Sequence, residues 1–171
     1  MGRNIEIKAR VEANEFAALR SRAELLATDG PIELIQEDTF FQTQNGRLKL
    51  REFADGTAEF IFYERQDSDG PKTSTYIRSE CVCPASMKAS LEKAVGICET
   101  VKKHREVFFI DQTRVHLDNV EGLGTFVELE VVMRDGQTES EGQAIANELM
   151  QSLEISNDQL VSGAYADLIK A

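Results

Sequence analysis

Charged and apolar residues alternate along much of this chain, and this alternation constrains the fold more than any other feature. In residues 3–11 the polar positions Asn4, Glu6, Lys8 and Arg10 alternate with Ile5, Ile7, Ala9 and Val11. The same pattern recurs in residues 46–54, 113–119 and 125–133. Because successive side chains of a strand point to opposite faces, each segment is predicted to be a β-strand with one apolar and one ionisable face.

Turn sequences such as Gln44-Asn45-Gly46 and Ala54-Asp55-Gly56 separate several of these segments. Several connections are too short for a crossover helix, which favours antiparallel pairing. The expected strands lie near residues 3–11, 37–43, 46–54, 58–65, 72–80, 99–109, 113–119 and 125–133.

Helical spacing and capping residues predict four helices between or after the strands. The first begins with Asn14 as N-cap and ends before Asp29-Gly30-Pro31, and the second covers Pro84 to Val95. The third and fourth begin at the capping boxes Thr138/Glu141 and Ser156/Gln159, and the fourth contains Leu160 and Tyr165. With no repeat or linker in sequence, residues 1–171 are predicted to form a single α+β domain.

The formal charge of −11 is unevenly distributed. Residues 12–38 and 134–171 each hold seven acidic and two basic residues, whereas the remaining residues are almost neutral. Both acidic segments contain predicted helices, so we expect their carboxylates to face solvent. The overall acidity argues against binding to nucleic acid or to an anionic membrane surface, since both require a basic surface.

Location and redox state follow from three further observations. No apolar run approaches the ~20 residues of a membrane helix. Residues 1–6 have no apolar signal-peptide core. Cys81, Cys83 and Cys98 are an odd set of thiols, which we interpret as structural and reduced in a cytoplasmic protein.

Two arrangements could accommodate the ionisable strand faces. An antiparallel sheet often has one packed face and one wet face. The alternative is a closed eight-stranded barrel with a charged interior, in which the charges pair with one another, a metal or a ligand. The density of ionisable groups favours the barrel. Lys and Arg in its interior would suit phosphate, and the carboxylates would suit Mg²⁺ or Mn²⁺ bridging to that phosphate.

Several blocks resemble the CYTH superfamily, the triphosphate tunnel metalloenzymes. Asn4-Ile5-Glu6-Ile7-Lys8 is similar to the Glu-x-Glu-x-Lys signature of that family. Further similar blocks, in family order, are Gly46–Glu52, Tyr63–Arg65, Gly70–Ser74, Lys103-x-Arg105 and His116–Glu130. The resemblance is closest to the class IV adenylyl cyclase-like branch. It implies an eight-stranded antiparallel closed β-barrel, the triphosphate tunnel, with helices packed outside.

The resemblance also implies roles for individual residues. The implied metal ligands are Glu6, Asp118, Glu128 and Glu130, and the implied phosphate-binding residues are Lys8, Arg47, Lys49, Arg51, Arg65, Lys103, Arg105 and Arg114. Glu6 and Lys8 are expected to act in catalysis. The chain departs from the family at Asn4, where the amide offers an oxygen but no charge.

The function expected from this resemblance is divalent-metal-dependent chemistry on a triphosphate-containing small molecule. Adenylyl cyclase-like conversion of ATP to cyclic AMP and pyrophosphate is the first expectation. The alternatives are hydrolysis of thiamine triphosphate or inorganic tripolyphosphate, and non-catalytic binding of nucleotide or polyphosphate. An exposed barrel seam or an apolar patch could support a homodimer. His116 shares the face of Arg114 and Asp118, whereas His104 is expected on the outer surface.

Overall fold

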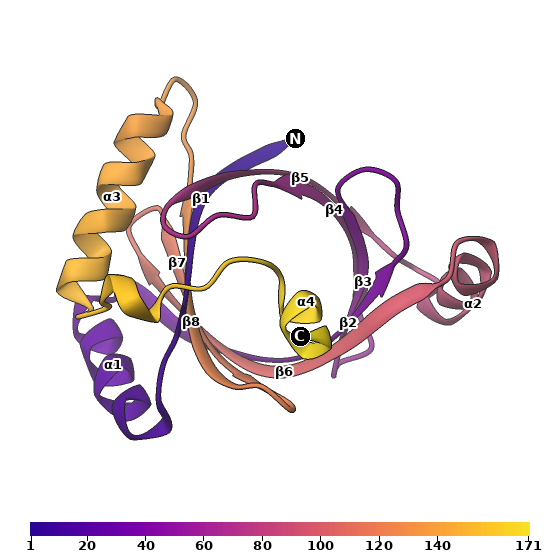
Figure 1. The fold of residues 1–171 in the computed structure, drawn as a ribbon, viewed down its shortest axis with the longest axis horizontal. Helices are drawn as coiled ribbons and strands as arrows, with labels where there is room; N and C mark the ends of the chain where they lie inside the picture. Colours follow the sequence, from indigo (N-terminus) through magenta and orange to yellow (C-terminus); the bar gives the residue numbers. More distant parts are fainter.

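Eight antiparallel strands close into a barrel in the computed structural model, which describes residues 1–171 (Figure 1). The order around the barrel is β1-β5-β4-β3-β2-β6-β7-β8. The strands are β1 (Gly2–Arg10), β2 (Asp29–Phe41), β3 (Arg47–Phe53), β4 (Ala58–Arg65), β5 (Lys72–Glu80), β6 (Ile97–Ile110), β7 (Thr113–Val120) and β8 (Gly124–Val132). This confirms the predicted eight-stranded antiparallel barrel.

The first strand closes the barrel because it pairs on both edges. Glu6 of β1 lies opposite Lys72 of β5 on one side and opposite Glu130 of β8 on the other. A closed sheet has no free edge, and every strand then has one face toward the barrel interior and one toward the outside.

Helices cover the outer, apolar faces of the barrel. Helices α1 (Ala13–Leu26) and α3 (Glu139–Ser152) lie together on one side, and α2 (Pro84–Ala94) lies on the opposite side (Figure 1). The main core contains Ile5 and Leu129 of the barrel with Leu19 of α1 and Met150 of α3. The apolar half of the alternation is therefore buried under helices, which turns the ionisable half inward.

A short C-terminal helix, α4 (Tyr165–Lys170), lies across one end of the barrel (Figure 1). The chain leading to it is attached to β1, since Val161 N–H donates to the carbonyl of Lys8 at 3.0 Å. The ring of Tyr165 packs edge-on against Phe126 of β8 at a centroid distance of 5.0 Å. One end of the tunnel is thus covered by residues 160–171.

The structure corrects some predicted boundaries. Strand β2 begins at Asp29, eight residues before the predicted start, because residues 29–36 pair with the long β6. Helix α1 begins at Ala13 after Glu12, so Asn14 is not its N-cap. The Thr138/Glu141 capping box is confirmed, but the Ser156/Gln159 box precedes only a 3₁₀ turn (Asn157–Gln159). Leu160 is outside any helix, and Tyr165 begins α4.

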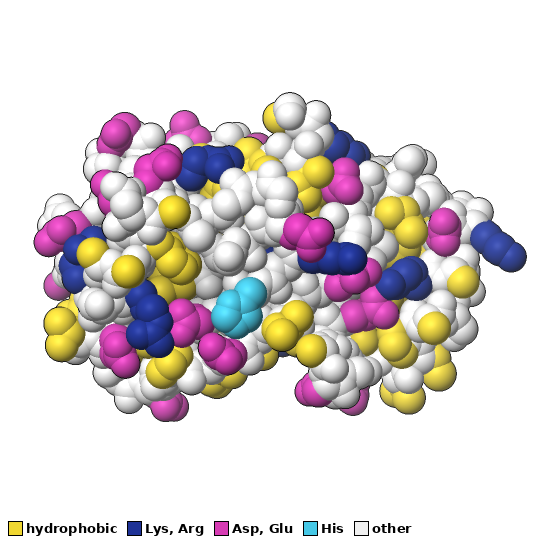
Figure 2. All heavy atoms as spheres, turned by 90° about the horizontal axis from the view of Figure 1, so that it is seen from below, with side chains coloured by type: hydrophobic (Ala, Val, Ile, Leu, Met, Phe, Trp, Pro, Cys, Tyr) yellow, Lys and Arg dark blue, Asp and Glu magenta, His cyan; other side chains and the backbone are white.

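Most acidic residues of the two acidic segments are exposed, as expected. Charged side chains of both signs are interspersed on the face shown in Figure 2. Asp38 is the exception, because it is only 1% exposed and points into the barrel. None of the helices is long and apolar enough to cross a membrane.

Candidate functional site

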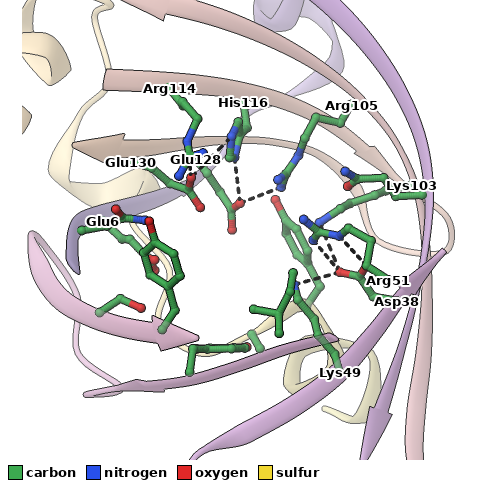
Figure 3. Close-up of a pocket in the computed structure, with 18 of the residues that line it drawn as sticks. Glu6, Asp38, Lys49, Arg51, Lys103, Arg105, Arg114, His116, Glu128 and Glu130 are labelled. Atoms are coloured by element: carbon green, nitrogen blue, oxygen red, sulfur yellow. Dashed lines mark hydrogen bonds and ion pairs between the residues drawn. The ribbon is translucent and has the colours of Figure 1, made fainter. Parts of the chain in front are cut away.

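The barrel interior is a pocket lined by ionisable side chains from all of its strands. Cationic residues that line it are Lys8, Lys49, Arg51, Arg65, Arg78, Lys103, Arg105 and Arg114, and acidic ones are Glu6, Asp38, Glu59, Glu128 and Glu130. The two signs are partly segregated (Figure 3). Glu6, Glu128 and Glu130 lie on one side, and Lys49, Arg51 and Lys103 lie on the other.

The carboxylate side of the tunnel is built by β1 and β8. Glu6 is directly opposite Glu130, and Lys8 is directly opposite Glu128. Burial and the Glu130 carboxylate raise the pKa of Glu6, although Arg65 donates to Glu6 at 2.9 Å. These carboxylates are therefore close enough to repel one another, and their cationic partners do not fully offset the repulsion.

Glu128 has the strongest set of cationic neighbours on this side. Lys8 Nζ lies 3.2 Å from one of its oxygens, and Arg105 donates to the other at 2.8 Å. Burial raises the pKa of Glu128, but Lys8, His116 and Arg105 outweigh this effect and lower it well below the usual range. Glu128 is thus ionised at neutral pH.

Asp118 occupies a different position from the other three carboxylates. It is fully buried and does not line the pocket. Both of its oxygens accept from Arg105 at 2.6 Å, and Oδ2 also accepts from the Tyr165 hydroxyl at 2.7 Å. Burial raises the pKa of Asp118, but Arg105 and Lys103 lower it to about 2. Its geometry is that of a bidentate support for Arg105.

The cationic side is organised around Asp38 of β2. Arg51 donates to both Asp38 oxygens at 2.7 Å, and Lys49 donates at 2.9 Å. Lys103 Nζ lies 3.8 Å from the same carboxylate. Burial and the Arg105 guanidinium lower the pKa of Lys103 to about 7. One carboxylate therefore gathers three cations that come from β3 and β6.

Two further cations contact the C-terminal segment. Lys8 and Arg65 both donate to the carbonyl oxygen of Gly163 at 2.9 Å. Lys8 Nζ also lies 4.1 Å from the centroid of the Tyr165 ring, and Lys103 Nζ lies 4.9 Å from it. Residues 163–165 thus complete the covered end of the tunnel.

Arg47 and Arg114 differ in where the structure places them. Arg47 is not in the pocket lining, because its guanidinium pairs with Asp67 at 2.7 Å and Asp167 at 3.0 Å. Arg114 lines the pocket and pairs with Glu130 at 3.1 Å. Of the residues expected from sequence, the structure therefore brings ten into the pocket and leaves Arg47 and Asp118 outside its lining.

Each histidine lies on the predicted side of the barrel wall. The His104 side chain is 49% exposed on the outer surface. His116 is buried inside, with Nδ1 3.6 Å from Glu128 and Nε2 3.6 Å from Glu130. Burial lowers the pKa of His116. A neutral imidazole therefore separates the two carboxylates.

The chemistry of the carboxylate side suits a divalent metal. Carboxylate oxygens are the ligands that Mg²⁺ and Mn²⁺ prefer, and Glu6, Glu128 and Glu130 supply them from adjacent strands. The buried Asn4 Oδ1 has no hydrogen-bond partner and can add a neutral oxygen. Each carboxylate is paired with a cation in this structure, and no three acidic, His or Cys residues are arranged in metal-binding geometry. The donor set fits, but the pairs must rearrange.

Comparison with known proteins identifies the family. The CYTH domain model matches residues 2–165, which is nearly the whole chain. The chain belongs to the CYTH family. A candidate adenylate cyclase from Methanocaldococcus jannaschii is 25% identical over 96% of this CYTH chain and 98% of its own length.

Solved structures share the CYTH barrel. The PH1012 protein from Pyrococcus horikoshii OT3 superposes with a TM-score of 0.81 at 21% identity, covering 97% of this chain and 99% of the other. A candidate adenylyl cyclase from Hippeastrum, described as having a dominant triphosphatase activity, gives a TM-score of 0.67 at 14% identity. That match covers 99% of this chain and 95% of the other.

Several pocket residues were missing from the site expected from sequence, among them Glu59 and Arg78 as well as Asp38, Gln36 and Tyr165. Asp38 lies at the start of an expected strand, in phase with Phe40, but it is the only ionisable residue on that face within the expected range. Gln36 precedes the expected range altogether. Tyr165 enters the tunnel from a helix that follows the barrel. No local pattern signals that contact.

Proposed function

We propose that this CYTH protein is a divalent-metal-dependent enzyme that acts on a triphosphate bound in the tunnel. The observation that carries the proposal is the partial segregation of charge within one closed barrel, with three carboxylates together on one side and the cations around Asp38 on the other (Figure 3). A triphosphate alone would be repelled by the carboxylates, whereas a metal-bound triphosphate would match both sides.

The proposed phosphate-binding residues are the cations that converge on the pocket, namely Lys8, Lys49, Arg51, Arg65, Lys103, Arg105 and Arg114. Arg47 would act indirectly, because it ties the loop at Asp67 to α4 at Asp167. The proposed metal ligands are Glu6, Glu128 and Glu130. For Asp118 the contacts favour a positioning role, since both of its oxygens are occupied by Arg105.

Mg²⁺ or Mn²⁺ held by these carboxylates would neutralise phosphate oxygens and polarise the phosphorus under attack. Side chains of the protein would carry out the proton transfer and stabilise the leaving group. Glu6 is the one carboxylate of the three whose pKa is raised in the metal-free protein, and its oxygen that does not bind the metal would accept the proton of the nucleophile. Lys8 and Arg105 would stabilise the charge that develops on the leaving phosphate.

The favoured reaction is cyclisation of ATP. The ribose 3′-oxygen would form a bond to the α-phosphorus, the bond from that phosphorus to the β-phosphate oxygen would break, and pyrophosphate would leave. The similarity to a candidate adenylate cyclase over almost the whole chain supports this choice.

Hydrolysis is the second candidate. Water would attack the terminal phosphorus of thiamine triphosphate or tripolyphosphate in the same tunnel. The bond from that phosphorus to the bridging oxygen would break, and orthophosphate and the remaining diphosphate would leave. The Hippeastrum protein, described as having a dominant triphosphatase activity, supports it by its shared fold. The two reactions use the same cations and differ in the nucleophile.

Non-catalytic binding is the third candidate, and Asn4 motivates it. Asn4 lies in the pocket, only 3% exposed, with its amide oxygen unpaired. Loss of one carboxylate could leave phosphate binding intact while weakening metal binding. Asn4→Glu tests this, because a large gain in turnover would indicate that the native metal site is incomplete.

The deciding experiment incubates the protein with ATP, thiamine triphosphate and tripolyphosphate in Mg²⁺ or Mn²⁺, and separates the products chromatographically. Cyclic AMP with pyrophosphate indicates cyclisation, and orthophosphate indicates hydrolysis. Glu6→Gln serves as the inactive control. Binding without turnover of any of the three would contradict the enzymatic proposal.

A further inference from the structure

The inward residues of β2 are buried near the end of the tunnel covered by α4 and become more exposed toward the opposite end. Phe40 packs with Tyr165 and Ala166 at the covered end and is 6% exposed. Further along β2, Asp38 and Gln36 are 1% and 3% exposed, whereas Ile32 on the same strand face is 47% exposed. Alternate strand residues are about 6.6 Å apart, so Ile32 lies roughly 26 Å from Phe40 along the strand. The end opposite α4 is therefore the open end.

The wall toward that open end carries an apolar residue on each of three adjacent strands, although Arg105 lies opposite Leu34 and donates to Asp118 and Glu128. Leu34 of β2, Phe53 of β3 and Val107 of β6 all line the pocket. Phe53 lies directly opposite Gln36, and Leu34 lies two residues beyond Gln36 along β2. Phosphate gains nothing from such a surface, whereas an uncharged organic group gains by displacing water from it.

Gln36 lies at the boundary between the apolar wall and the cations. Its cross-strand neighbour on β6 is Lys103, and Asp38 is two residues away on β2. The side chain lines the pocket, yet its amide oxygen is buried and has no hydrogen-bond partner. An unpaired buried polar group is costly, so a group that pairs with it on binding would remove that cost.

We infer that Gln36, Leu34, Phe53 and Val107 form a subsite for the organic group of a nucleoside triphosphate. The inference rests on the proposed function, since the phosphates must lie among the cations for the organic group to reach this wall. A carboxamide offers one donor and one acceptor side by side, which matches the edge of adenine. The flat base would lie against Phe53 and Leu34 while its edge pairs with Gln36.

The test compares two probes by isothermal titration calorimetry in Mg²⁺. The probes are adenosine 5′-(α,β-methylene)triphosphate and inorganic tripolyphosphate, whose integrity is checked after each titration. Gln36→Leu and Phe53→Ser are expected to weaken binding of the adenosine analogue at least fivefold and of tripolyphosphate less than twofold. Ile35→Ser is the matched control, because Ile35 is on the same strand but 63% exposed on the outer face.

Wild-type protein supplies a second measurement that needs no variant. Burial of apolar surface makes the heat-capacity change of binding more negative, so the adenosine analogue should give a clearly more negative value than tripolyphosphate. Equal heat-capacity changes, or variants that weaken both probes alike, would overturn the subsite and leave the triphosphate tunnel standing. Failure of wild-type protein to bind either probe would overturn the proposed function and the subsite together.

Discussion

Replacement of Asp118 by asparagine separates two roles for this residue, support of Arg105 and ligation of a metal. Asp118 is fully buried and accepts two hydrogen bonds from Arg105 and one from Tyr165. Loss of one partner from a buried ion pair costs about 3–5 kcal/mol. Arg105 keeps Glu128 as a partner at 2.8 Å, so we expect a cost at the lower end of this energy range. We expect Asp118→Asn to lower the free energy of unfolding by about 3 kcal/mol.

For a chain of this length, 1 kcal/mol corresponds to roughly 2–4 °C, so the melting temperature should fall by about 6–12 °C. Differential scanning calorimetry measures this change, and titration with Mn²⁺ measures metal binding on the same samples. Glu130→Gln is the matched control, because Glu130 is a carboxylate that lines the pocket and is partly exposed. It should weaken Mn²⁺ binding with little change in melting temperature.

The reasoning would be refuted by the opposite pattern. If Asp118→Asn melts within about 2 °C of the wild type and loses Mn²⁺ binding as Glu130→Gln does, Asp118 is a metal ligand. The close Arg105 pair would then exist only in the metal-free protein.

Four further predictions test neighbouring parts of the site. Tyr165→Phe keeps the ring over the lysines but removes the hydroxyl donor to Asp118, and it should cost about 2 kcal/mol in urea unfolding; an unchanged midpoint would contradict this contact. Arg51→Ala should raise KM for the triphosphate at least tenfold, because a buried bidentate donor is lost, and unchanged KM and kcat would remove Arg51 from the site. The pKa of Lys103 is lowered to about 7, so at pH 8.5 this amine is largely neutral in the free protein. A bound triphosphate favours the ammonium form, so binding should take up protons at pH 8.5, and affinity should fall as the pH rises above 7; calorimetric enthalpies that are identical in buffers of different ionisation enthalpy would argue against it. Addition of EDTA should abolish turnover but leave the protein folded, because the carboxylates then pair with cations, and turnover that survives EDTA would exclude the metal requirement.

The barrel was predictable from sequence because burial acts on alternate residues. In β1 the charged residues Glu6 and Lys8 alternate with apolar residues such as Ile5, so the charged face could point either into the barrel or out of it. Helices with apolar stripes pack on the apolar face from outside, which leaves the charged face inside. The early part of β2 was not predictable, since residues 29–36 carry both Pro31 and mixed polarity. Pairing with the long β6 makes this segment a strand despite its weak local preference.

The predicted residue rows gave the direction of each side chain but not its depth. Asp118 alternates in phase with Arg114 and His116, and all three are turned inward as expected. Their environments differ because Asp118 accepts a hydrogen bond from Tyr165 of α4, whereas Arg114 pairs with Glu130 of β8. Contacts between segments far apart in the chain have no local signature, so the sequence does not predict the places of Tyr165 and Gln36 in the site.

The pairing of β1 with β8 has a consequence for how the protein acquires its chemistry. Glu6 and Glu130 lie on the two strands that meet when the barrel closes, and more than a hundred residues separate them along the chain. Such distant pairing is slow to form, since a long loop must be closed before any contact compensates. The pairing of β2 with β3 brings Asp38 to Arg51 within one hairpin, whereas Glu6 and Glu130 meet only in the closed barrel. The carboxylate side of the tunnel therefore depends on a long-range pairing that the Asp38–Arg51 pair does not need.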